Sequence, residues 1–81
     1  MKYYIYIVLC SDGSFYTGYT QNIEKRVLEH NTSKKGAKYI RGKVPVKLVY
    51  SEEFETKSEA LRREIEIKSF KREKKKTLFE N

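Results

Sequence analysis

The apolar and polar positions divide the chain into strands and helices. Residues 3–10 form a run of apolar β-branched and aromatic side chains, which is typical of a buried strand, and a second short run covers residues 14–20. Between them lie Ser11, Asp12 and Gly13, all of which are common in turns. The two runs therefore predict a β-hairpin.

The length of this turn decides which tyrosines share a face of the hairpin. A two-residue turn would place Tyr6 and Tyr16 on opposite faces of the sheet. In a three-residue turn Gly13 takes the left-handed conformation, Val8 pairs with Tyr16, and Tyr6 pairs with Gly18. We prefer this register because it gives one face a cleaner apolar set: Ile5, Ile7, Leu9, Phe15 and Tyr19. The other face then carries Tyr4, Tyr6 and Tyr16.

Capping signals predict two helices after the hairpin. Thr20 or Asn22 can cap a helix that ends near His30, and a loop follows at residues 33–36. Thr56 with Glu59 matches a capping box and opens a helix expected to end near residue 68.

The remaining segments complete the predicted fold. Residues 44–54 alternate like a third strand, and a lysine-rich last helix at residues 71–79 can dock through Phe70, Leu78 and Phe79. The order ββαβαα predicts an α+β fold in which helices pack on a three-stranded antiparallel sheet. The length of 81 residues suits a single domain, residues 1–81, with a modest core.

Composition adds a compartment and a class of partner. Cys10 is the only cysteine, and the chain shows no signal segment or membrane-spanning run, so we expect a soluble cytoplasmic protein with no membrane partner. The net charge of +7 favours polyanions such as nucleic acids, although charge alone predicts no chemistry. Ribosomal and chromatin proteins share this composition.

One carboxylate stands out on the second long helix. Glu64 falls in the middle of a helical stripe formed by Ala60, Leu61, Ile65 and Ile67. A buried carboxylate needs a cation, a metal ion or a hydrogen-bonding network. A plain structural explanation is an ion pair with Lys68 or Arg26, and this spacing alone leaves both explanations open.

The first helix places Arg26 and His30 four residues apart along one side. A guanidinium can clamp a phosphate and an imidazole can relay a proton, but a histidine near a helix end is also a common packing residue. Tyr4, Tyr6 and Tyr16 likewise could be ordinary strand residues with hydrated hydroxyls.

Together these positions read Y-I-Y, Y-T-G-Y-T, R-x-x-x-H and A-L-R-R-E, and this series resembles the GIY-YIG endonuclease superfamily. The likeness covers almost the whole chain, and the phrases A-K-Y-I-R-G and D-G-S-F-Y-T-G are similar to its short, stand-alone bacterial branch. Some positions depart from the family pattern: Tyr4 replaces a glycine, Thr17 an isoleucine, and Tyr19 a lysine that some members carry. The polar residue found beyond the glutamate in many members has no evident counterpart.

The resemblance implies a site and a reaction. It assigns catalytic roles to Tyr6, Tyr16, Arg26, His30 and Glu64. In the implied hydrolysis of a DNA phosphodiester, Glu64 would hold a single Mg²⁺ or Mn²⁺ ion, Arg26 would neutralise the phosphate, and Tyr16 would be the general base. Tyr6 would orient the water, although the two tyrosine roles could be exchanged.

The basic residues predict the contacts to the nucleic-acid backbone, with DNA favoured over RNA. The expected backbone-binding residues are Lys34, Lys35, Lys38, Arg41, Arg62 and Arg63. We expect a monomer that cuts DNA, including branched or flapped forms. The alternatives are a non-catalytic nucleic-acid-binding module on the same scaffold and a structural protein of the ribosome.

Overall fold

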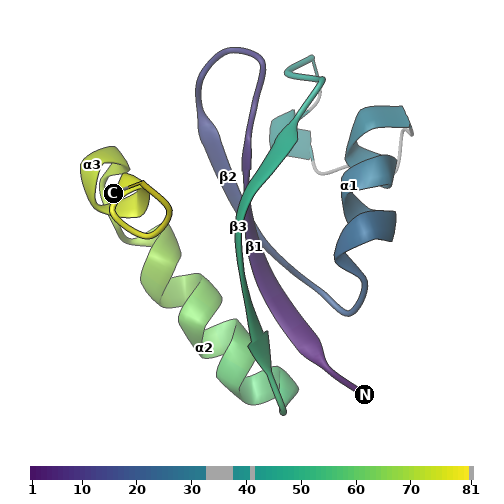
Figure 1. Ribbon diagram of the computed structural model, residues 1–81, viewed down its shortest axis with the longest axis vertical. Coiled ribbons are helices and arrows are strands. Elements are labelled where there is room, and N and C mark those ends of the chain that lie inside the picture. Colours follow the sequence, from purple (N-terminus) through teal and green to yellow (C-terminus); the bar gives the residue numbers. More distant parts are fainter. Residues whose placement is uncertain (33–37, 41, 81) are drawn as a thin grey trace.

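A computed structural model describes residues 1–32, 38–40 and 42–80 of the chain. Three strands and three α-helices follow one another in the predicted order, with a short 3₁₀ helix, η1, before the third strand (Figure 1). The bounds are β1 Tyr3–Leu9, β2 Phe15–Thr20, α1 Ile23–Thr32, η1 Lys38–Ile40, β3 Lys47–Phe54, α2 Lys57–Lys68 and α3 Arg72–Lys76. The predicted α+β class and the order ββαβαα are confirmed.

The hairpin has the predicted three-residue turn. Gly13 takes a φ of 87°, and the backbone N–H of Cys10 donates to the carbonyl of Ser14 at 2.8 Å. β1 and β2 pair so that Tyr6 faces Gly18 and Val8 faces Tyr16. Because side chains alternate along a strand, Tyr6 and Tyr16 project from the same face of the sheet.

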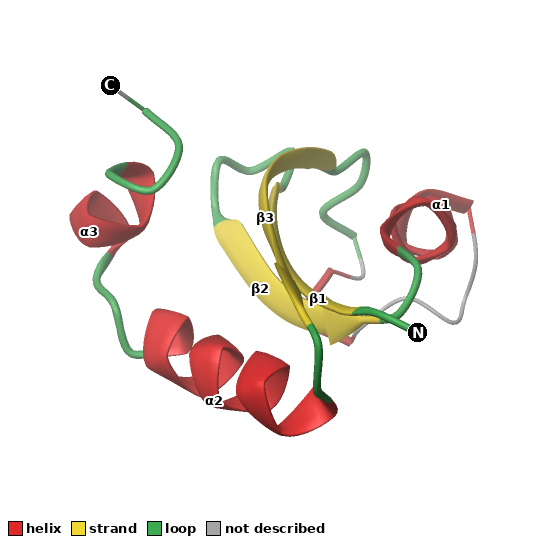
Figure 2. Cartoon of the chain, turned by 60° about the horizontal axis from the view of Figure 1, so that its bottom comes forward, coloured by secondary structure: helices red, strands yellow, loops and turns green. Residues whose placement is uncertain are grey.

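The antiparallel sheet has the order β2-β1-β3, so that β1 is central. Its two faces are covered by different helices: α1 lies on one side, and α2 and α3 lie on the other (Figure 2). The α1 side buries Tyr6, Val8, Cys10, Ile40 and Val46, whereas the α2 side buries Ile5, Ile7, Ala60 and Ile67. Each face of β1 therefore builds its own core.

Both predicted helix starts are confirmed. The N–H of Lys25 donates to Asn22 Oδ1 at 3.1 Å, so Asn22 caps α1. Thr56 and Glu59 form the reciprocal capping box of α2. These side chains satisfy backbone N–H groups that the first helical turn leaves unpaired, which fixes where each helix begins.

The third strand begins later than the prediction of residue 44. β3 starts at Lys47 because the backbone of Val46 is already bound elsewhere. Its N–H donates to Asn31 Oδ1 at 2.7 Å, and its carbonyl accepts from Asn31 Nδ2 at 3.1 Å. One amide side chain at the end of α1 thus takes both backbone groups that a neighbouring strand would use.

The last helix is shorter than the predicted residues 71–79, since α3 covers Arg72–Lys76 and turns continue to Phe79. Its predicted docking residues are confirmed, because Phe70, Leu78 and Phe79 all pack against the core on the α2 side. Phe79 meets Phe15 of β2 edge-on, with 5.4 Å between the ring centroids.

One member of the predicted apolar stripe of α2 was assigned wrongly. Ile65 is 69% exposed, whereas Ala60 and Ile67 are completely buried. The buried side of the helix is therefore narrower than the stripe read from the sequence, and Glu64 lies at its edge with 16% of its side chain exposed.

Candidate active site

Tyr6 is the centre of the candidate site. It lies on the central strand with only 1% of its surface exposed, and its hydroxyl is 2.8 Å from Nε2 of His30 on α1. His30 is itself 3% exposed. The structure therefore brings together two of the predicted residues as a buried, hydrogen-bonded pair.

Gly18 makes room for this tyrosine. A Cβ atom at position 18 would lie 2.4 Å from the hydroxyl oxygen of Tyr6 and 2.5 Å from its Cζ. Since Tyr6 and Gly18 are opposite one another in the β1–β2 ladder, the ring lies directly over the glycine. The glycine of the Y-T-G motif is required here for close approach of a side chain rather than for a special φ.

Tyr16 joins the pair from the neighbouring strand. The centroid of its ring is 6.3 Å from that of Tyr6 and 5.6 Å from that of His30, with the His30 ring meeting it edge-on. The three rings thus form one aromatic cluster under α1. The shared face that the three-residue turn predicts is what allows this cluster.

Arg26 lies one helical turn before His30 and is partly buried. Its Nη1 donates to Glu29 Oε1 at 3.2 Å, an ion pair in which both side chains are about one-quarter exposed, 27% and 26%. Burial works against the charge, but the hydrogen bonds to Glu29 and Tyr6 raise the pKa of Arg26. The guanidinium therefore remains charged beside the tyrosine cluster.

Burial sets the protonation states of the central pair. It raises the pKa of Tyr6 to about 12. Tyr16 and the charge of Glu64 also raise this pKa, whereas the hydrogen bond and charge of Arg26 lower it. Burial, and then the charge of Arg26, lower the pKa of His30. At neutral pH a protonated phenol therefore faces a neutral imidazole, so that Tyr6 can donate and His30 can accept.

Alkaline pH is expected to destabilise the fold through Tyr6. A pKa of about 12, against 10.0 for an ordinary tyrosine, means that the folded state holds this proton longer than the unfolded chain. This contribution, roughly 2–3 kcal/mol, is complete below pH 10 and is lost as the pH rises through the folded pKa. The free energy of unfolding in urea, measured between pH 8 and 12 for the unchanged protein and for Tyr6→Phe, would isolate the contribution of this proton. If NMR shows that Tyr6 ionises at the same pH as the exposed tyrosines, its pKa is not raised and the prediction is wrong.

Glu64 approaches the cluster from the other side of the sheet. It lies on the inward edge of α2, and its Oε2 is 3.3 Å from Nζ of Lys68, so the plain ion pair expected from the sequence does form. Lys68 is 51% exposed, however, and such a solvent-screened pair contributes little. The charge of Glu64 adds to the raised pKa of Tyr6, although less than burial and Tyr16 do.

The donor set suits a weakly held hard cation. Within the described ranges no three His, Cys, Asp or Glu side chains gather into a metal-binding group, so Glu64 would act as a single carboxylate ligand. Mg²⁺ commonly binds one or two carboxylates and keeps several waters. On the sheet face that α2 covers, Thr17 Oγ1 is buried and has no hydrogen-bond partner among the described residues. Such a hydroxyl can bind an ordered water.

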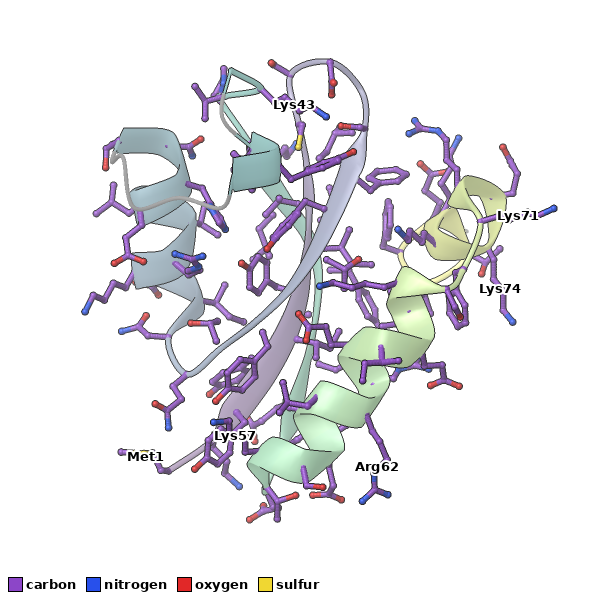
Figure 3. The ribbon with its side chains drawn as sticks, turned by 180° about the vertical axis from the view of Figure 1, so that it is seen from behind. Met1, Lys43, Lys57, Arg62, Lys71 and Lys74 are labelled. Atoms are coloured by element: carbon purple, nitrogen blue, oxygen red, sulfur yellow. The ribbon has the colours of Figure 1, made fainter. Side chains whose placement is uncertain are left out.

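The predicted backbone-binding residues fall into separate groups. Lys34, Lys35 and Arg41 lie outside the described residues, and of Lys38 only the backbone position in η1 is described. Arg62 is exposed and points away from the body of the protein (Figure 3). Arg63 instead binds Glu52 of β3 at 3.0 Å and Glu66 at 2.7 Å, so its charge is largely neutralised within the protein.

Tyr39 touches the cluster and was not among the predicted site residues. It stacks on Tyr16 with the ring centroids 5.8 Å apart and an interplanar angle of 26°. Its sequence signal is the phrase A-K-Y-I-R-G, which contributed to the family resemblance but carried no assigned role. Spacing could not reveal it, since the contact spans the whole of α1.

Comparison with known proteins gives a consistent result. The family model described as the GIY-YIG catalytic domain matches residues 2–77. A UPF0213 protein of Staphylococcus saprophyticus is 61% identical over 78 residues, which cover 96% of this chain and 94% of that protein. A UPF0213 protein of Haloquadratum walsbyi is 60% identical over 78 residues, which cover 96% of this chain and 86% of that protein.

Solved structures match along nearly the whole chain. The NMR solution structure of a UPF0213 protein of Bacillus halodurans has 49% identity and a TM-score of 0.61, covering 96% of this chain and 82% of that one. A second NMR structure, from E. faecalis, has 44% identity and a TM-score of 0.65, with coverage of 95% and 81%. Among the described residues, no helix is both long and apolar enough to span a membrane.

Proposed function

Since the chain belongs to the GIY-YIG catalytic domain family, we propose that it is an endonuclease that hydrolyses DNA phosphodiesters with the help of one divalent metal ion. The family points to nuclease chemistry and to nucleic acid in general. The choice of DNA, including branched or flapped forms, and the need for Mg²⁺ or Mn²⁺ are part of the proposal. The charge of +7 supports a polyanionic substrate.

One observation carries this proposal. The hydroxyl of Tyr6 lies 2.8 Å from Nε2 of His30 on α1, and the charge of Glu64 on α2 adds to the raised pKa of Tyr6. Ordinary packing of a small domain does not require a buried phenol, an imidazole and a guanidinium in one cluster, with a partly buried carboxylate within electrostatic range of it. Such a gathering of titratable groups is typical of active sites.

The residues divide the work of phosphodiester hydrolysis. Arg26, which stays charged, neutralises the nonbridging oxygens as negative charge grows on them. Tyr6 keeps its proton, because its pKa is about 12, and is suited to orient the attacking water. That leaves Tyr16 as the general base, and His30 accepts the hydrogen bond of Tyr6 through Nε2.

Glu64 is the residue that would hold the metal ion. When bound, the ion would act as a Lewis acid that stabilises charge on the leaving oxygen. The carboxylate keeps 16% of its side-chain surface exposed, and its ion-pair partner among the described residues, Lys68, is 51% exposed.

A cleavage panel tests the proposed function. Linear, flapped and four-way branched DNA, together with matched RNA, would be incubated with the protein in Mg²⁺, in Mn²⁺ and in EDTA. We expect products from DNA in the presence of either ion and none in EDTA. Binding that weakens with salt, without turnover on any substrate in any metal, would instead support the non-catalytic binding module.

A further inference from the structure

An exposed aromatic ring stands next to the general base and has no role in the chemistry described so far. Tyr39 of η1 is 46% exposed, although it stacks on Tyr16 with the ring centroids 5.8 Å apart. A large aromatic side chain is costly to leave in water. Its exposed surface lies one ring away from the residue that would face the cleaved phosphate.

A cation accompanies this ring. Nζ of Lys43 lies 3.6 Å from the centroid of the Tyr39 ring and 3.5 Å from Oδ2 of Asp12 in the hairpin turn. The lysine side chain is 28% exposed, so water screens its ion pair only in part. The site thus offers an aromatic face and an ammonium group together.

The backbone holds this pair in place. The N–H of Ser11 donates to the carbonyl of Lys43, and the N–H of Lys43 donates to the carbonyl of Ile40, both at 2.8 Å. Ile40 is 1% exposed and anchors η1 in the core under α1. The tip of the hairpin and the segment that carries Tyr39 are therefore fixed to one another and to β2.

We propose that Tyr39 and Lys43 form a subsite for an unpaired nucleotide beside the cleaved phosphodiester. Its base stacks on the ring of Tyr39, and the ammonium of Lys43 moves from the ring to the phosphate of that nucleotide. Stacking of a base on an aromatic side chain is at least as strong as the contact of a partly exposed ammonium with the same ring, and the lysine gains a phosphate partner when it leaves, so the base displaces it.

This subsite deepens the proposed function, on which it rests, by defining the substrate. A base inside a duplex is stacked on its neighbours and cannot reach a protein ring without leaving the helix. A nucleotide in a flap, a loop or a single strand is already available. The subsite therefore selects nucleic acids that present an unpaired base at the cleavage point, without reading which base it is, since every base has an aromatic face.

The test measures binding in EDTA, where no cleavage is expected. A single-stranded oligonucleotide with one 2-aminopurine is titrated with protein, because stacking quenches the fluorescence of this base. We expect quenching with the unchanged protein and with Tyr39→Phe. With Tyr39→Leu we expect the quenching to be lost and the dissociation constant to rise about tenfold, within the range measured for base–aromatic stacking.

Matched controls separate the two contacts. Lys43→Gln is expected to keep the quenching but to lower the slope of log affinity against log salt by about 0.7, the loss of one phosphate contact to a single strand. The exposed Lys47 and Ile65 lie outside the subsite, so Lys47→Gln and Ile65→Ala should bind like the unchanged protein. A duplex of the same sequence should be bound equally by Tyr39→Leu and the unchanged protein.

Several results would overturn the subsite. The proposal is wrong if Tyr39→Leu quenches the 2-aminopurine as strongly as the unchanged protein does. It is also wrong if Tyr39→Leu loses as much affinity for the duplex as for the single strand. NMR of the unchanged protein covers the case of a variant that fails to fold: ring protons of Tyr39 must shift upfield when the oligonucleotide is added, and unmoved signals refute the proposal. Stacking without any cleavage in the metal panel would refute the nuclease and leave the subsite standing.

Discussion

Replacing Glu64 by glutamine is expected to lower metal-dependent cleavage about a thousandfold while leaving the fold unchanged. The substitution keeps the shape of the side chain but removes the charge that would hold the ion, and Lewis-acid stabilisation of a leaving group amounts to several kcal/mol. The fold should tolerate it, because the ion pair that is lost joins Glu64 to a lysine with 51% of its side chain exposed. Initial rates across a range of Mg²⁺ concentrations, with thermal unfolding, would measure both effects.

Glu66 provides the matched control for this variant. It lies two residues further along α2, is exposed and pairs with Arg63, so Glu66→Gln changes the net charge equally and leaves the carboxylate at position 64 in place. Its cleavage rate should stay within about twofold of the unchanged protein. If Glu64→Gln cleaves as fast as Glu66→Gln, the metal is held elsewhere and the assignment is wrong. Broadening of NMR signals by Mn²⁺ gives a second readout, and it should disappear around residue 64 in the glutamine variant.

Replacing Gly18 by alanine is expected to reduce both stability and cleavage. The added methyl would fall 2.4 Å from the hydroxyl oxygen of Tyr6, which has almost no exposed surface and is bonded to His30. Overpacking of this kind costs roughly 1–3 kcal/mol. Moving a catalytic group by about 1 Å lowers rates on the order of a hundredfold. Chemical denaturation and initial rates at saturating substrate would test the pair of effects.

The steric origin of this effect can be isolated by a double-mutant cycle. If the contact with the hydroxyl is the cause, Gly18→Ala should destabilise Tyr6→Phe less than it destabilises the unchanged protein. Gly42→Ala is the contrasting variant, because nothing lies within 4 Å of a Cβ there and only the φ of 80° opposes it. Tyr6→Phe keeps Cζ, which would lie 2.5 Å from the added Cβ, so equal destabilisation by Gly18→Ala in both backgrounds would assign the clash to the ring and not to the hydroxyl.

Local chemistry was sufficient to predict the parts of the site that depend on one element. The three-residue turn fixes the register of β1 and β2, and the register alone puts Tyr6 and Tyr16 on one face. The capping residues Asn22 and Thr56 fix where α1 and α2 begin, and therefore which of their side chains face the sheet. His30 and Glu64 therefore turn inward as the helical periodicity indicates.

Contacts between distant segments could not be predicted in this way. Asn31 ends the pairing of β3 at Val46, but nothing in the alternation of residues 44–54 records a side chain on another element. The stacking of Tyr39 on Tyr16 and the capture of Arg63 by Glu52 have the same character. Each is a tertiary contact between segments that are distant in sequence, and the periodicity of apolar residues within one segment does not indicate it.

The docking of the last residues on the hairpin has a consequence for how the protein is made. Arg72 donates to the carbonyl of Gly13 across 59 positions of sequence, and Phe79 closes over Phe15. Synthesis proceeds from the N-terminus, so the strand that carries Tyr16 is made early but remains uncovered until position 79 has emerged. A nascent chain can thus form the tyrosine hairpin long before residues 72–79 are available to dock on it and stabilise it.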